Sequence, residues 1–338
     1  MALKAIVPVF TLVFAALIIK SNGSEENFSR EEDLELERQL KMLNKPAIKT
    51  IKTEYGDIFD CVDIYEQPAF DHPLLKNHKI QMIPSFLANR STSKQEASSM
   101  ARVVGLPDGG CPQGSVPIRR TNKEELRNAR KFFNHENGTA MPNANDQNKV
   151  YGTRFVANVW GLQLEEGQAN CYKNTGCYNT LCSGFVQIDT QIPLGAYLEP
   201  LSVYKGPQYE IHVEIYKDLS SDGNWWLVLS DNKPVGYWPF ELFSGLPDHA
   251  TNLEWGGYVH GPRGKQSPPM GSGHFSRRHT FGTTCFVKEI HLMDNYRSFY
   301  DPKGKYIYFG TGKRFYQQSG ICGQDGHGCS MYFGGTGW

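Results

Sequence analysis

Apolar and polar residues alternate along several short segments in the second half of the chain. In "QYEIHVEIYKD", residues 208–218, the odd-numbered positions from Tyr209 to Ile215 are apolar, and Glu210, His212 and Glu214 lie between them. This period of two is typical of a strand with one buried face. "NWWLVLS", "CFVKEIHLMD" and "KYIYFGT" follow, each bounded by Gly, Asp, Asn or Ser. Strands at this spacing, with no helical pattern between them, predict an all-β domain over residues 135–338, an antiparallel sandwich or barrel.

The first third of the chain has a helical pattern instead. Leu36, Leu40 and Leu43 fall on one face of "EEDLELERQLKMLNK", which follows a capping box at residues 29–32 and precedes Pro46. An amphipathic helix is therefore predicted here, and Pro46 ends it.

A second capping box, Thr121-Asn-Lys-Glu124, precedes "ELRNARKFF". Stretches rich in Gly, Pro and Ser separate the two helices, and "TEYGDIFDCVDIYEQPAFDHPLL" is the most ordered pattern between them. Residues 24–134 are therefore predicted to form a separate, mixed and partly helical unit. Its leucine face needs an apolar partner, so we expect the unit to cover the cleft side of the β domain.

The amino terminus, "MALKAIVPVFTLVFAALIIKSNGS", has the pattern of a secretory signal. Lys4 supplies the positive start, residues 6–19 form the apolar run, and small polar residues follow at 21–24. The run is short and ends abruptly, which favours a cleaved signal over residues 1–23. An uncleaved anchor is the alternative. We expect a secreted, extracellular protein with no membrane contact once the signal is removed.

The charge balance excludes several partners. The chain has 35 basic and 35 acidic residues, so no net field attracts nucleic acid or anionic lipid. We expect no nucleic-acid partner, and we expect a monomer.

The 8 cysteines fit an oxidising compartment, in which disulfides are the default. No paired C-x-x-C motifs occur, so we expect neither a metal site nor a cofactor. Cys177 and Cys182 enclose a short, turn-rich loop and are predicted to form a bridge. The remaining connectivity is open, since eight cysteines allow 105 pairings.

Three sequons, at Asn27, Asn89 and Asn137, predict glycosylation at the surface.

Two segments suggest other kinds of site. Ser272 and His274 in "GSGHF" lack the Gly-x-Ser-x-Gly spacing of a nucleophile elbow, so a serine hydrolase is not favoured. Trp225, Trp226 and Trp238 could form an aromatic platform for a sugar or proline ring. Filling of the core is the alternative for at least one of the adjacent pair.

Longer motifs resemble the plant neprosin family. "LELERQLKMLNKPAIKTIKTEYGDIFDCVDIYEQPAFDHPLLKNH" and "GCPQGSVPIRRTNKEEL" are similar to its activation peptide. "NVW", "TGCYNTLCSGFVQ", "GNWWLVL", "VGYWPFELF", "WGGYV" and "MGSGHF" are similar to its peptidase domain. The resemblance covers nearly the whole chain beyond the signal. It implies a glutamic endopeptidase that cleaves next to proline, made as a secreted zymogen with a fold of two bent antiparallel sheets.

The family uses two glutamates, one as general base and one as proton donor, whose shared cleft drives their pKa values apart. One of them lies in a "Gly-Gly-Glu" segment, where this chain has Gly256, Gly257 and Tyr258. A phenol with a pKa of about 10 cannot act as a base in acid. The resemblance therefore predicts that Tyr258 replaces a catalytic carboxylate.

The segment of the second glutamate is absent, because the chain is shortened near residues 160–175. Glu165, in "LEEG", is the one candidate for a surviving carboxylate. In the alternative, Glu165 and Glu166 belong to the loop after "NVW". The catalytic residues are thus unknown.

The resemblance also bears on the disulfides. Bridges are expected at Cys61, Cys111, Cys322 and Cys329, with Cys329 as a substitute partner for Cys322. Cys171 and Cys285 are expected to pair with each other.

Three hypotheses follow. In the first, the chain is a catalytically impaired relative that binds a proline-containing peptide or an extracellular protein of the apoplast, besides its own propeptide. In the second, it is an active acid-pH glutamic peptidase that uses Glu165 and a recruited carboxyl group. In the third, it is the product of a mis-spliced or mis-predicted gene. The predicted binding cleft comprises Trp226, Trp238, Trp255, Gly256, Gly257 and Tyr258.

Overall fold

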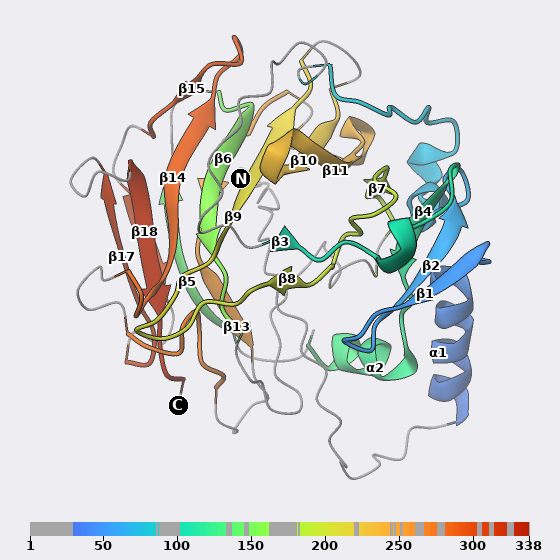
Figure 1. The fold of residues 1–338 in the computed structure, drawn as a ribbon, viewed down its shortest axis with the longest axis horizontal. Coiled ribbons are helices and arrows are strands. Elements are labelled where there is room, and N and C mark those ends of the chain that lie inside the picture. Colours follow the sequence, from blue (N-terminus) through green and yellow to red (C-terminus); the bar gives the residue numbers. More distant parts are fainter. Residues whose placement is uncertain are drawn as a thin grey trace, which may run out of the picture.

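A computed structural model shows the fold (Figure 1). It describes residues 30–85, 87, 102–132, 137–144, 149–161, 181, 183–219, 223–243, 246, 248–250, 253–260, 267–275, 281–302, 306–310, 314–322 and 328–337. Among these residues, no helix is long and apolar enough to cross a membrane.

The amino-terminal unit combines two helices with a three-stranded antiparallel sheet. The sheet has the order β1-β2-β4, formed by β1 (Lys49–Lys52), β2 (Ile58–Asp63) and β4 (Ser115–Arg119). Helix α1 (Arg30–Leu43) contacts α2 (Lys123–Phe132). Leu36 is fully buried, whereas Leu40 and Leu43 are half-buried, so the predicted leucine face is the packed face of α1.

The capping box of α2 lies one residue later than predicted. The Glu125 backbone N–H donates to the Asn122 side chain at 2.9 Å, and the Asn122 N–H donates to the Glu125 carboxylate at 3.0 Å. Thr121 instead receives a hydrogen bond from Asn44 at its carbonyl and donates one to Asn44. Asparagine is on average a better cap than threonine, and the Thr121 backbone is held by Asn44, directly after α1.

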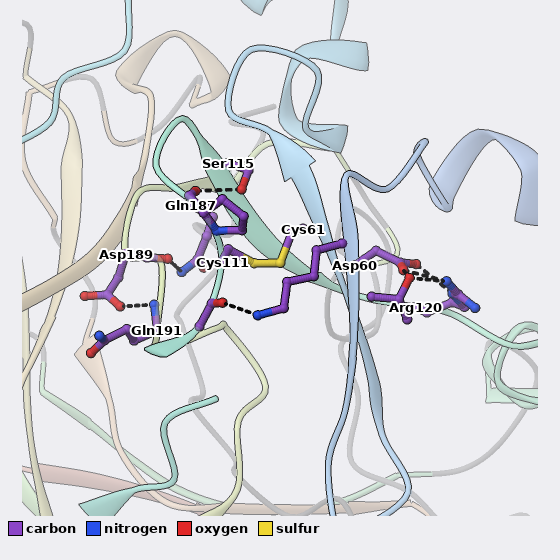
Figure 2. Close-up of a disulfide and its surroundings, with 12 residues drawn as sticks. Asp60, Cys61, Cys111, Ser115, Arg120, Gln187, Asp189 and Gln191 are labelled. Carbon is purple, nitrogen blue, oxygen red and sulfur yellow. Dashed lines mark hydrogen bonds and ion pairs between the residues drawn. A yellow bond between two sulfur atoms is a disulfide. The ribbon is translucent and has the colours of Figure 1, made fainter. Parts of the chain in front are cut away.

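A disulfide between Cys61 and Cys111 crosslinks this unit (Figure 2). It joins β2 to the loop that contains η4 (Pro107–Gly109). The Cys111 N–H donates to the Thr190 carbonyl at 2.8 Å, so the crosslinked loop also contacts the β domain. A two-stranded sheet of β3 (Arg102–Val103) and β8 (Leu198–Glu199) adds a second connection.

The β domain is built on a nine-stranded antiparallel sheet that curves through the molecule in Figure 1. Its order is β17-β18-β14-β6-β9-β10-β11-β7, with β15 pairing with β14. The bounds are β17 (Gln317–Cys322), β18 (Cys329–Gly334), β14 (Cys285–Met293), β6 (Gly152–Asn158), β9 (Glu210–Lys217), β10 (Trp225–Leu229), β11 (Lys233–Trp238), β7 (Val186–Gln187) and β15 (Phe299–Tyr300).

A second, four-stranded sheet packs on one face of the first. Strand β5 (Asn137–Ala144) lies in its middle and pairs with β12 (Leu253–Glu254), β13 (Gly257–His260) and β16 (Tyr306–Gly310). The core between the sheets contains Ile211, Val213 and Met331 from the large sheet and Leu253 and Val259 from the small one. The prediction of an all-β antiparallel sandwich with a partly helical amino-terminal region is thus confirmed.

Cys285 does not pair with Cys171, contrary to expectation. Its thiol is free and buried in the core between the sheets. Its strand position explains this, since it shares the inward face of β14 with Val287. Cys329 does form a disulfide, and Cys322 lies directly opposite it across β17 and β18. The predicted bridge between Cys177 and Cys182 lies outside the described residues.

The Cys285 thiol should be chemically inert in the native protein. Complete burial raises its pKa to about 12, so the reactive thiolate is scarce at pH 8. We expect no alkylation of Cys285 by iodoacetamide at pH 8 in the folded chain, and complete alkylation in denaturant, as measured by mass spectrometry of peptides. Rapid labelling of the folded chain at this residue would contradict the burial of Cys285 in the core between the sheets.

Candidate functional site: the covered face of the large sheet

The face of the nine-stranded sheet away from the small sheet has an apolar floor at one end. Trp226 of β10 and Tyr216 of β9 lie side by side in register and are fully buried. Tyr237 of β11 is also fully buried, with its ring 4.6 Å from that of Trp226. Because side chains alternate along a strand, Trp225 and Leu227 face the core between the sheets instead.

The amino-terminal unit covers this floor. Its η1 (Pro68–Asp71) and η2 (Pro73–Leu75) helices precede a segment without regular structure. Ala69, Phe70, Ile80 and Leu87 pack on the cluster that contains Trp226. The covered area explains why β10 has five buried residues in succession, since both of its faces are packed.

Polar side chains surround the floor. Asp218, directly after β9, is almost fully buried and accepts hydrogen bonds from the Gln81 side chain at 3.0 Å and the Ser85 N–H at 2.7 Å. The Asn224 side chain donates to the Gln81 carbonyl oxygen Oε1 at 3.0 Å. Beside them, burial lowers the pKa of the Lys217 ammonium. These contacts fix residues 81–85 against the ends of β9 and β10.

A second polar group connects the segment to β11 through a histidine. The Gln81 N–H donates to the Tyr237 hydroxyl at 3.0 Å, and that oxygen lies 2.9 Å from His78 Nε2. His78 Nδ1 lies 3.4 Å from Glu241 Oε1. The three contacts are compatible when Nδ1 donates to Glu241 and Nε2 accepts from the tyrosine hydroxyl, which in turn accepts from the Gln81 N–H.

Contacts at β7 complete the interface. The Gln67 side chain accepts from the Gln187 N–H at 2.8 Å and donates to the Gln187 carbonyl at 3.2 Å, as a neighbouring strand would. The Leu106 N–H donates to the Gln191 carbonyl at 2.9 Å. Figure 2 shows Gln187, Asp189 and Gln191 next to the Cys61–Cys111 disulfide, so this end of the large sheet is held by the crosslinked loop.

The same sheet face carries a charged row beyond the covered end. Lys288 of β14 lies 2.8 Å from Glu210 of β9, and both are largely buried. Burial lowers the pKa of His212, against the opposing effect of the carboxylates of Glu289 and Glu210. Glu210 is thus the ion-pair partner of Lys288 on this face.

The structure does not gather the predicted cleft residues on one surface. Trp226 lies under the amino-terminal unit, whereas Trp238 faces the core between the sheets, with its ring 4.6 Å from that of Phe185. Trp255 is buried in that same core. All three indole rings are used for packing; core filling was the predicted alternative for at least one of the adjacent pair, Trp225 and Trp226.

The glycines of this segment serve packing as well. A Cβ on Gly257 would lie 2.6 Å from Met270 Cγ, so glycine permits β13 to approach the core closely. Gly256 is half-buried and precedes β13. Tyr258 pairs with Thr139 of β5, and its side chain lies outside the described residues.

The remaining candidates are distributed differently. Glu165, Glu166, Asn27 and Asn89 lie outside the described residues. Of the region of the predicted deletion, 160–175, the structure describes residues 160 and 161. Asn137 begins β5 opposite His260.

Ser272 and His274 do not form a nucleophile–base pair. The buried Ser272 hydroxyl donates to the Thr283 carbonyl at 2.8 Å, while the His274 ring stacks on Tyr204 with a centroid distance of 3.9 Å. Within the described ranges, no group of three His, Cys, Asp or Glu side chains could hold a metal ion.

Comparison with known families agrees with this architecture. The model of the neprosin domain matches residues 148–336, and that of the neprosin activation peptide matches residues 50–157. The chain belongs to the neprosin family. The activation-peptide match begins within β1, after α1, and includes the rest of the unit that covers the large sheet; it continues through β5 into β6 of the sandwich.

Sequence reasoning missed the residues that join this neprosin activation peptide to the sandwich. Asp218 and Asn224 are polar, nearly unexposed, and placed at the ends of the strongest strand pattern. Buried polar residues need hydrogen-bond partners, but the sequence does not indicate that Gln81 supplies them. The one available signal is the position of Asn224 directly before β10, a continuously apolar strand that is buried on both faces.

Proposed function

We propose that this chain is a secreted neprosin-family protein with impaired catalysis, which binds a proline-containing peptide or an extracellular protein without cleaving it. The observation that carries the proposal is the sequence of β13, where Tyr258 follows Gly256 and Gly257 at the place of the family's "Gly-Gly-Glu". A phenol does not replace a carboxylate as general base in acid. Secretion after removal of residues 1–23, glycosylation, and a propeptide boundary near residue 134 belong to this proposal.

The packing of the amino-terminal unit supports the binding role. A unit that covers the tryptophan and tyrosine side chains of the large sheet protects an apolar surface from solvent. Exposed apolar areas of this kind commonly mark binding sites. Release of the unit would therefore make a peptide-binding surface available even in a chain without the catalytic pair.

A peptidase assay tests the proposal. We expect no cleavage of a proline-containing peptide at acid pH by the chain, and none by its Tyr258→Glu variant, because a lone restored carboxylate lacks a second one. Loss of a general acid or base typically costs about 10²–10⁴-fold in rate. Product formation is measured by mass spectrometry.

The runner-up is an active glutamic peptidase that uses Glu165 with a second carboxyl group. This alternative would be established if the unmodified chain cleaves the peptide and the Glu165→Gln substitution abolishes the cleavage. The same result would refute the proposal of impaired catalysis. A Glu166→Gln variant is the matched control, since it removes the neighbouring carboxylate only. Transcript sequencing across residues 158–177 separates both from a mis-spliced gene product.

A further inference from the structure

The Gln81 side chain is recognised at both ends of its carboxamide. Its Nε2 donates to Asp218 Oδ2 at 3.0 Å, and its Oε1 accepts from Asn224 Nδ2 at 3.0 Å. Asp218 is 1% exposed and Asn224 0% exposed, so both partners are fixed groups of the sandwich. A carboxylate in place of the carboxamide would present an oxygen to the buried Asp218 carboxylate, and two acceptors would then face each other. The arrangement selects glutamine over glutamate.

The backbone on either side of this glutamine is also held by the sandwich. The Gln81 N–H donates to the Tyr237 hydroxyl at 3.0 Å, and the Ser85 N–H donates to Asp218 Oδ2 at 2.7 Å. Backbone contacts of this kind do not depend on the side chains of the bound segment. They fix the path of the chain from residue 81 to residue 85.

Between these two backbone contacts, the order of burial is the reverse of what hydrophobicity predicts. Met82 and Ile83 are 54% and 61% exposed, whereas Pro84 is buried. Proline has no N–H to satisfy and has a fixed φ, so it loses little freedom when it is held. The segment therefore contacts the sandwich through a glutamine, a proline and two amides, and not through its largest apolar side chains.

We propose that Asp218, Asn224 and Tyr237 form a binding site for peptides of the pattern Gln-Xaa-Xaa-Pro-Xaa, which residues 81–85 of the chain's own amino-terminal unit occupy as a tethered ligand. The proposal rests on the proposed function, because it requires that the unit can leave this site to another peptide. The site lies on the large sheet, whereas the segment containing Tyr258 belongs to the small sheet.

Release of the tethered segment creates the need for a replacement ligand. The Asp218 carboxylate is almost unexposed, and its Oδ2 accepts hydrogen bonds from Gln81 and Ser85. A buried carboxylate that loses hydrogen bonds is costly, so groups that restore them bind favourably. A free peptide with the same carboxamide and amide donors supplies the same contacts. In the intact chain the tether gives residues 81–85 a high effective concentration, which excludes such a peptide.

The test uses the full-length chain with a Gln81→Glu substitution, which opens the site without changing the sandwich. The probe is a labelled synthetic peptide of residues 78–87. We expect amide exchange of Ser85 to be at least about tenfold faster in the Gln81→Glu chain at pH 7, and the peptide to bind this chain at least about tenfold more tightly than the unmodified one. Tenfold in affinity corresponds to about 1.4 kcal/mol.

Matched controls make the result specific. A Met82→Glu chain adds the same charge at an exposed neighbour and should behave like the unmodified chain. Probe peptides with the equivalent of Gln81→Glu or Pro84→Ala should each bind the opened chain at least about tenfold more weakly. Any one of three outcomes would overturn the proposal. The three probe peptides bind equally well, no peptide binds to an opened chain, or amide exchange is unchanged in the Gln81→Glu chain. Cleavage of the bound peptide would instead refute the proposal of impaired catalysis, and the proposed peptide-binding site at Asp218, Asn224 and Tyr237 would stand.

Discussion

Replacement of Trp226 by alanine is expected to lower the free energy of unfolding by about 3–5 kcal/mol, the usual cost of truncating a buried aromatic residue. Trp226 is completely buried, with the Tyr237 ring 4.6 Å away on one side and the amino-terminal unit packed on its cluster. The loss should therefore have two components. The β domain loses packing within its sheet, and the activation-peptide unit loses part of the surface on which Phe70 and Ile80 lie. Chemical denaturation measures the first component, and amide exchange over residues 69–87 measures the second.

Trp225→Ala is the matched control, because it truncates the same side chain one position earlier in the same strand. Trp225 faces the core between the two sheets, and its indole N–H donates to the Leu246 carbonyl at 3.2 Å. We expect a similar loss of global stability but no selective increase of exchange over residues 69–87. Equal acceleration of exchange in both variants would show that Trp226 has no particular role in holding the amino-terminal unit.

The strands of the β domain could be predicted because their pattern follows from burial on one face. The alternation from Glu210 to Lys217 is that of β9, with Ile211, Val213 and Ile215 in the core. The same reasoning failed to place the tryptophans of β10. When a strand is buried on both faces the period of two disappears, so the sequence does not show which of Trp225 and Trp226 faces the second sheet.

The contacts of the candidate site could not be predicted for a different reason. Gln81 and Asp218 are 137 residues apart in the chain, and nothing local to either position indicates the other. Asp218 appears in the sequence as an ordinary strand-terminating aspartate, and Gln81 as one polar residue in an irregular segment. Local patterns specify elements, whereas the pairing of buried polar groups depends on how those elements pack.

The same limit applies to the segment around Tyr258. The sequence predicts that Trp255, Gly256 and Gly257 lie in a binding cleft. The space beside Gly257 is filled by Met270 and Phe333 of the core. A missing Cβ permits close approach by any neighbour, and the sequence alone does not distinguish a ligand from the protein's own second layer.

Removal of the Cys61–Cys111 bridge by a double Cys61→Ala and Cys111→Ala substitution is expected to cost about 4 kcal/mol in the amino-terminal unit. The two cysteines are 50 residues apart. A crosslink that closes a loop of this length lowers the entropy of the unfolded chain, and this destabilises the unfolded state by about 4 kcal/mol. Under oxidising conditions, denaturation monitored within residues 30–132 should show the loss. Under reducing conditions the unmodified chain should become as unstable as the double variant.

The bridge also has a consequence beyond its own unit, because it fixes the loop that contacts the sandwich. The Cys111 and Leu106 amides donate to the Thr190 and Gln191 carbonyls at 2.8 Å and 2.9 Å. Without the crosslink this loop has more freedom to lose on docking, so the double variant should also release the unit from the large sheet, with faster exchange at both amides. A Cys285→Ala chain, which keeps the bridge and removes the buried free thiol, is the control and should retain slow exchange there. A double variant in which these amides stay as protected as in the unmodified chain would show that docking depends on the apolar floor around Trp226 and not on the crosslinked loop.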